Sequence, residues 1–161
     1  MNARVFGRQL SFAAVMAALY AVVTNQLGPF AYSLVQVRLS EALTPLPFLF
    51  GFPAVIGLAL GCIVANVFSP VGLPDMIFGP LLTLLAAVLS WKFSFGKRLL
   101  ACIYPVVINA FGVSVYLAPI SNVPYVWSVA GVGAGEAISA ILLGYPLLRA
   151  IEKVPKLVWK E

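Results

Sequence analysis

Four long stretches of this 161-residue chain contain no charged side chain: residues 9–37, 42–74, 76–91 and 99–135. Only 9% of the residues are charged and 62% are hydrophobic, which gives a mean hydropathy of +1.04. A soluble domain carries about 25% charged residues, and a helix that crosses a bilayer needs roughly 20 mostly apolar residues. The pattern predicts an all-α polytopic protein of the cell membrane, with a single membrane domain over residues 1–161.

Proline, glycine and charged residues divide the apolar runs into six predicted spans. These spans cover residues 9–27, 37–50, 54–68, 75–93, 99–117 and 125–150. The second and third are short, because about 14 residues at ~1.5 Å rise reach only about 21 Å across a ~30 Å hydrocarbon core. Pro45 and Pro47 would also break or kink the second span. Broken backbone at membrane depth is tolerated where it lines a cavity, so we expect a binding site there.

The basic residues predict the orientation of the spans. If the N-terminus is inside, every lysine and arginine except Arg38 falls on the inner side. This positive-inside bias places both termini in the cytoplasm. The net charge of +5 is explained by this bias and by anionic lipid, so nucleic-acid binding is not needed to explain it. The first apolar run is long and has no clear cleavage site, so we expect a retained helix rather than a signal peptide.

Several chemistries are excluded or disfavoured by composition. The chain has no histidine, which excludes Ser-His and Cys-His nucleophilic pairs and histidine-based zinc sites. It has no G-x-x-x-x-G-K-[ST] motif, so it has no P-loop for ATP. Cys62 and Cys102 lie in apolar runs and are expected to be packing residues. We expect no catalytic site, no metal and no cofactor.

Ionisable residues within predicted spans indicate a functional site, because placing them in a membrane costs a few kcal/mol. Four such residues are accompanied by two asparagines: Arg38, Glu41, Asp75, Glu136, Asn66 and Asn109. In the six-span arrangement most of them lie toward the outer side, while Glu136 lies near mid-membrane. Together they predict a polar, substrate-binding pocket open to the outside.

Structural interpretations of the same residues remain open. Arg38 and Glu41 are three residues apart and could form a local ion pair on one helical face. Asp75 follows a proline and could simply cap the fourth span. Glu136 has no basic residue nearby in the sequence and would need a partner from another helix.

Small residues recur at intervals of four in three of the spans, a spacing that lets another helix approach closely. In the third and sixth spans, at Gly57, Gly61, Ala65, Gly131 and Gly135, we expect packing within the bundle. The first span carries Ala13, Ala17 and Ala21, and also Ala14 and Ala18. These alanines indicate either internal packing or the docking of a partner protein.

Residues 35–47 contain the string Arg-x-Ser-Glu-Ala-Leu-Thr, and residues 61–70, followed by residues 75–79, contain Ala-Asn-x-Phe-Ser-Pro. These three segments resemble the signature of the queuosine-precursor transporter family. The similarity extends over most of the chain. Members of this family are substrate-binding S components of energy-coupling factor transporters.

The resemblance implies a six-helix S component that captures a 7-deazaguanine base, with a separate transmembrane coupling subunit and two ATPase subunits. The row Ala13, Ala17 and Ala21 resembles the Ala-x-x-x-Ala motif through which S components dock on the coupling subunit. A carboxylate suits the N1–H and exocyclic amine of such a base, and Arg38 or an asparagine suits its carbonyl. Stacking on such a base is expected from Phe30, Tyr32 or Tyr116.

Two other functions stay open, and a third is disfavoured. An S component for another vitamin or nucleobase would keep every feature except the ligand. A stand-alone channel or proton-coupled carrier would use Glu136 and Asp75 as relay groups. An intramembrane enzyme is disfavoured by the missing nucleophile–base and metal-ligand clusters. Residues 29–36, between the first two spans, are expected to act as a lid over the ligand.

Overall fold

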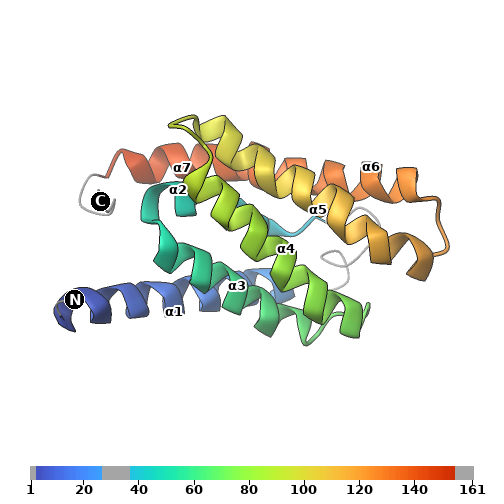
Figure 1. The fold of residues 1–161 in the computed structure, drawn as a ribbon, viewed down its shortest axis with the longest axis horizontal. Helices are drawn as coiled ribbons and strands as arrows, with labels where there is room; N and C mark the ends of the chain where they lie inside the picture. The colour runs from blue at the N-terminus through green and yellow to red at the C-terminus, as the bar shows by residue number, and fades with distance from the viewer. Residues whose placement is uncertain (1–2, 27–36, 155–161) are drawn as a thin grey trace.

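The fold is taken from a computed structural model that describes residues 3–26 and 37–154. Within these ranges the chain is helical and forms no strand (Figure 1). The elements are α1 (Ala3–Gln26), the 3-10 helix η2 (Leu39–Leu43), α2 (Pro47–Phe50), α3 (Phe52–Asn66), α4 (Leu73–Lys92), α5 (Arg98–Ile120), α6 (Tyr125–Glu136), the π-helix η3 (Ala137–Leu143) and α7 (Gly144–Glu152).

The prediction of an all-α polytopic membrane protein is confirmed. Four helical segments are long and apolar enough to cross a membrane: Ala3–Gln26, Leu73–Lys92, Arg98–Ile120 and the continuous Tyr125–Glu152, which joins α6, η3 and α7. Two shorter apolar segments, Leu39–Phe50 and Phe52–Asn66, occupy the second and third predicted spans. These two spans are therefore short, as their sequences predict.

The second predicted span is not one helix but two short pieces. Arg38 is extended, η2 follows it, and α2 begins only at Pro47. A proline fits the first position of a helix because its missing N–H would have no partner there. Gly51 separates α2 from α3 with a φ of 62°, a conformation that glycine adopts without strain. The prolines and this glycine explain the break.

The other helix ends differ from the predicted ones by a few residues. α1 begins at Ala3 rather than at residue 9, so its first turns are more polar than a span requires. The last predicted span is a single helix with a π-helical segment, which hydropathy alone does not predict. π-helical segments are frequent at functional sites.

Most basic residues lie toward one end of the bundle. The N-terminal end of α1, the C-terminal ends of α4 and α7 and the beginning of α5 all lie toward the left of Figure 1. These parts carry Arg4, Arg8, Lys92, Arg98 and Arg149. The arrangement agrees with the expected orientation, which places this end in the cytoplasm.

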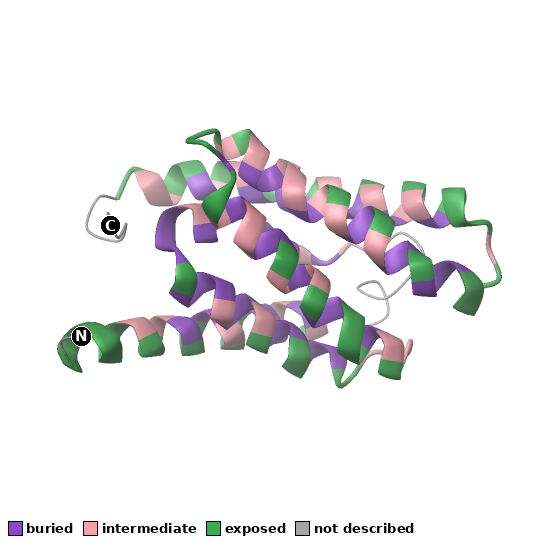
Figure 2. Ribbon diagram, in the orientation of Figure 1, coloured by how far each residue is buried: buried purple, intermediate pink, exposed green. Residues whose placement is uncertain are grey.

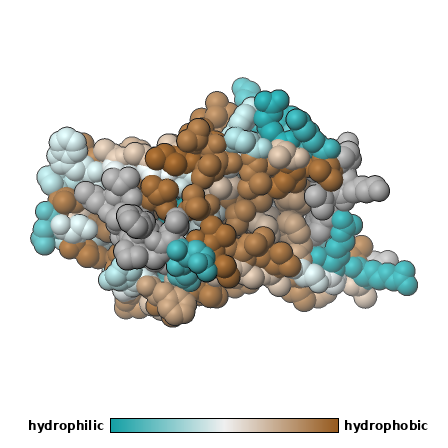
Figure 3. Space-filling model, turned by 180° about the vertical axis from the view of Figure 1, so that it is seen from behind, coloured by the Kyte–Doolittle hydropathy of each residue, from teal (hydrophilic) through white to brown (hydrophobic). Residues whose placement is uncertain are grey.

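Large apolar side chains face outward along the long helices, as contact with lipid requires. Examples are Leu10, Val22, Leu81, Val115 and Leu142. The exposed faces point away from neighbouring helices in Figure 2, and hydrophobic residues cover most of the middle of the surface in Figure 3. A soluble protein rarely exposes apolar patches of this extent.

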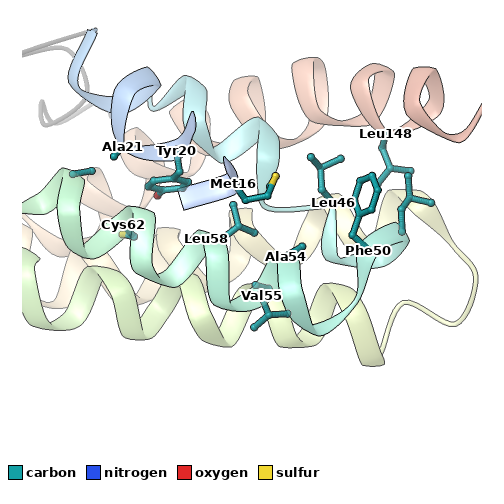
Figure 4. Close-up of a cluster of buried hydrophobic side chains, with 13 residues drawn as sticks. Met16, Tyr20, Ala21, Leu46, Phe50, Ala54, Val55, Leu58, Cys62 and Leu148 are labelled. Carbon is teal, nitrogen blue, oxygen red and sulfur yellow. The ribbon is translucent and has the colours of Figure 1, made fainter. Parts of the chain in front are cut away.

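The main apolar core lies among α1, α2, α3, α4 and α7. Met16, Leu46, Phe50, Leu58 and Leu148 belong to it, and Figure 4 shows them gathered between these helices. The same cluster contains Tyr20 of α1, whose hydroxyl reaches the polar residues described next. The core thus holds one side of the candidate site.

Candidate functional site

A buried ion pair connects two of the predicted site residues. Arg38 Nη2 lies 2.9 Å from Asp75 Oδ2, and the two side chains are only 4% and 0% exposed. The hydroxyl of Tyr116 donates to Asp75 Oδ1 at 2.7 Å. The pair therefore ties the segment before η2 to the beginning of α4 and to α5. Asp75 is not the cap of α4, since the N-cap residue is Gly72 and has no side chain to offer.

Glu41 forms a second buried centre, on η2. The hydroxyl of Tyr20 donates to Glu41 Oε1, and Thr44 Oγ1 donates to Glu41 Oε2 at 2.5 Å. Next to them, Thr24 Oγ1 donates to Ser40 Oγ at 2.6 Å. Two side chains of α1 are thus bonded to η2, and the irregular segment is fixed by polar contacts rather than by its own helical length.

Glu136 is the deepest carboxylate of the last helix. It is 2% exposed and ends α6 directly before η3. Asn109 of α5 donates to Glu136 Oε1 at 3.0 Å, whereas Oε2 is buried and has no hydrogen-bond partner. η2, which carries Glu41, packs against η3, which begins directly after Glu136. One half of this carboxylate is therefore satisfied and the other half is not.

Asn66 presents the same asymmetry. Its Nδ2 donates to the backbone carbonyl oxygen of Asp75 at 2.7 Å and to Cys62 Sγ at 3.6 Å. Its Oδ1 is buried and has no partner. A buried polar atom without a partner costs about 1–3 kcal/mol, so two such acceptors in one cluster indicate an incomplete site.

The structure buries all six predicted site residues and groups them. Arg38, Asp75 and Asn66 are joined through α4, Asn109 is joined to Glu136, and the packing of η2, which follows Arg38 and carries Glu41, on η3 brings the two groups together. We call this set the polar cluster; with its hydroxyl partners it comprises Arg38, Glu41, Asn66, Asp75, Asn109, Glu136, Tyr20, Thr44 and Tyr116.

Sequence reasoning missed the hydroxyl partners Tyr20 and Thr44, because hydroxyls inside apolar runs give no charge or spacing signal. Tyr116 is one of three aromatic residues expected to stack on the base that the resemblance implies. In the structure it donates to Asp75, and its ring stacks on Phe78 with centroids 6.0 Å apart. Phe30, Tyr32 and the expected lid over residues 29–36 lie outside the described residues.

Chemically, the polar cluster combines three carboxylates with one guanidinium and keeps two acceptor atoms open. Such a site suits a ligand that presents several N–H donors. Within residues 3–26 and 37–154, no three histidine, cysteine or acidic residues are grouped as a metal ion would need.

The alanine row of α1 faces the bundle. Ala13 and Ala21 are 7% exposed, and Ala17 is partly exposed. A Cβ on Gly57 or Gly61 of α3 would come within 2.6 Å of the backbone oxygen of Ala13 or Ala17, respectively. The row and the two glycines thus serve close packing of α1 on α3, as expected for the third span. Ala14 and Ala18, by contrast, are exposed.

Comparison with known proteins agrees with the membrane fold and with the resemblance in sequence. No curated protein and no solved structure matches the chain. A family profile described as "QueT transporter" matches residues 10–153, which is most of the chain and includes every residue of the polar cluster. The resemblance to the queuosine-precursor transporters is confirmed: the chain belongs to the QueT transporter family.

Proposed function

We propose that this protein is the S component of an energy-coupling factor transporter and that it captures a 7-deazaguanine base, a queuosine precursor, in the polar cluster. The proposal is supported by membership of the QueT transporter family. The observation that carries it is the pair of buried acceptors without partners, Glu136 Oε2 and Asn66 Oδ1.

Glu136 is the residue we propose for the donor edge of the base. A 7-deazaguanine presents N1–H and an exocyclic amine side by side, and a carboxylate accepts from both. Asn109 donates to Oε1, which keeps a second lone pair, and Oε2 has no partner, so both oxygens can accept from the ligand. An uncompensated carboxylate at this depth is costly, and a ligand with N–H donors offsets that cost.

Other members of the polar cluster supply complementary groups. Arg38 and the amide of Asn109 are donors for the carbonyl oxygen of the base, and Glu41 and Asp75 are further acceptors. Binding requires some of the internal hydrogen bonds to be exchanged for bonds to the ligand. The short, broken segment around η2 suits such a change, since fewer helical bonds hold it.

Energy would come from partner subunits, since the sequence has no P-loop. We propose that α1 docks on the transmembrane coupling subunit, which works with two ATPase subunits. The proposed contact is the exposed face of α1 that contains Ala14 and Ala18 and is bordered by the partly exposed Ala17. Small side chains allow a partner helix to approach closely.

Ligand binding is tested with the purified protein in detergent and 7-deazaguanine bases. Glu136→Gln replaces one acceptor by a donor, which would oppose an N–H of the ligand. The affinity should fall by about 30- to 1000-fold, equivalent to about 2–4 kcal/mol. Glu152→Gln, at the far end of the same helix, is the matched control and should bind like the wild type. Glu136→Gln affinity within about threefold of wild type (about 0.7 kcal/mol) would assign Glu136 a structural role.

Docking is tested by co-purification with the coupling module. Ala18→Trp should abolish complex formation and uptake while leaving ligand binding intact, because the bulky ring lies on the exposed face of α1. Val115→Trp, at an equally lipid-facing position of α5 that is 67% exposed, is the control and should leave the complex intact. Uptake that persists without any ATPase partner would instead support a stand-alone carrier.

A further inference from the structure

Gly79 of α4 lies directly against the side-chain amide of Asn66. A Cβ added at Gly79 would be 2.2 Å from Asn66 Nδ2 and 3.4 Å from Asp75 Oδ1. Real Cβ atoms essentially never come within 3.0 Å of such an atom. Any other residue at this position would therefore have to displace the amide, which is fully buried.

The orientation of this amide is fixed by its neighbours. The acceptors of its two N–H groups are the backbone oxygen of Asp75 at 2.7 Å and Cys62 Sγ at 3.6 Å. A reversed amide would place its own oxygen against the Asp75 carbonyl oxygen, where two acceptors repel each other. Asp75 is itself held by Arg38 and Tyr116. Oδ1 is consequently the atom of this amide that has no hydrogen-bond partner.

We propose that Gly79 is a positioning residue for Asn66, and that Asn66 is a specificity-determining residue whose Oδ1 accepts one N–H donor of the ligand. The inference rests on the proposed function, since it needs the ligand in the polar cluster. It adds a chemical requirement to the substrate: the atom facing Asn66 carries a hydrogen. A base with a methylated or unprotonated nitrogen there leaves Oδ1 unpaired and binds more weakly, by about tenfold or more.

The positioning role is tested without ligand, by the thermal unfolding midpoints of a double-mutant cycle. Gly79→Ala should lower the midpoint in the wild type but not in the Asn66→Ala background, where the clashing amide is gone. Asn66→Ser serves as the second background, should Asn66→Ala fail to fold. An equal loss in all backgrounds would show that the Cβ meets something other than the amide and would overturn this role.

Gly112→Ala is the matched control for the cycle. A Cβ at Gly112 would come within 2.5 Å of Leu82 Cδ2, a clash that is also below 3.0 Å but purely apolar and that involves no member of the polar cluster. Gly112→Ala should lower the thermal unfolding midpoint by the same amount in the wild type and in the Asn66→Ala background. Ligand affinity of the folded Gly112→Ala protein should equal that of the wild type, whereas Gly79→Ala should lower it.

The specificity role is tested with 7-deazaguanine and three analogues, each lacking one donor: N1-methyl, 2-deamino and N9-methyl. In the wild type, removal of the donor that faces Asn66 should cost about tenfold or more in affinity. In Asn66→Ala this penalty should disappear while the other two remain. Unchanged penalties in a variant that still binds would overturn the specificity role alone. If the wild type binds no 7-deazaguanine, the proposed function fails together with this role, and the unfolding cycle still decides the role of Gly79.

Discussion

Two helix contacts of α3 are both too close to admit a Cβ but differ in chemistry. Toward α1, Gly57 and Gly61 lie against backbone oxygens, each 2.6 Å from the place where a Cβ would stand. Toward α4, Asn66 lies against Gly79, and the atom that a Cβ would meet belongs to a side-chain amide. The first contact involves rigid helical backbone, and the second involves hydrogen-bonded polar groups.

This difference separates packing from recognition. At the α1–α3 contact a tight fit brings the helical backbone of α1 against the glycines of α3. At the α3–α4 contact the tight fit orients an amide whose oxygen has no partner. The same small residue therefore stabilises the bundle in one place and prepares a ligand contact in the other. Variants at the two contacts should therefore differ in how much they lower the free energy of unfolding and in whether they also lower ligand affinity.

The largest effect on stability is expected at the polar contact, from Asp75→Asn. The change removes the charge that faces Arg38 across 2.9 Å in a buried pair. Breaking a buried ion pair by removing one partner costs about 3–5 kcal/mol. The free energy of unfolding, measured by denaturant titration in mixed micelles, should fall by this amount.

The double variant Arg38→Gln/Asp75→Asn is the control for this change. It removes both charges and should be more stable than Asp75→Asn alone, because no arginine then faces a neutral residue at position 75. A double variant at least as unstable as the sum of the single ones would mean that the two charges do not stabilise each other. The contact between α3 and α4 would then be stabilised by packing rather than by charge, as the contact between α1 and α3 is.

The fold was largely predictable, because a bilayer imposes helices on long apolar runs. The breaks around Pro45, Pro47 and Gly51 were also predictable, since these residues disturb helical geometry locally. The π-helical segment after Glu136 was not, because it depends on how that helix packs on η2 and α5.

At the apolar contact, Gly61→Ala is the next test. Its Cβ would stand 2.6 Å from the Ala17 backbone oxygen and 2.7 Å from Tyr20 Cβ, so α1 would have to move. Overpacking of this kind costs about 1–3 kcal/mol. Gly7→Ala, where nothing lies within 4 Å, should cost nothing by the same measurement. A Gly61→Ala protein as stable as wild type would contradict the close packing of α1 on α3 at this position.

Tyr20→Phe probes the place where the two kinds of contact meet. The ring of Tyr20 packs in the apolar core, while its hydroxyl donates to Glu41. Loss of a hydrogen bond to a charged group costs about 1.5 kcal/mol, toward the lower end of the usual range. Tyr104→Phe, which loses an exposed bond to a backbone oxygen, should cost less. Equal unfolding free energies for the two variants would contradict the importance of the Glu41 bond.

The site was predictable in its charged members but not in their pairing. Arg38 and Glu41 are neighbours in sequence, yet Arg38 reaches Asp75, 37 residues away, and Glu41 accepts one of its two hydrogen bonds from Tyr20 of α1. A local spacing rule cannot predict contacts that depend on how distant helices cross. The same limit explains why the alanines of α1 could not be divided from sequence into those facing α3 and those facing outward.

The smallest effect is expected far from both contacts, at the end of the bundle that carries most basic residues. Arg98 Nε and Nη2 lie 2.6 and 3.0 Å from the carboxylate oxygens of Glu152, but both side chains are more than a third exposed. Exposed ion pairs contribute about 0–1 kcal/mol and are weakened by salt. Glu152→Gln should therefore lower the free energy of unfolding by less than about 1 kcal/mol. The difference from wild type should shrink further in high salt, and ligand affinity should not change. A loss as large as that of Tyr20→Phe, unaffected by salt, would show that this end is held as firmly as the buried contacts of α3.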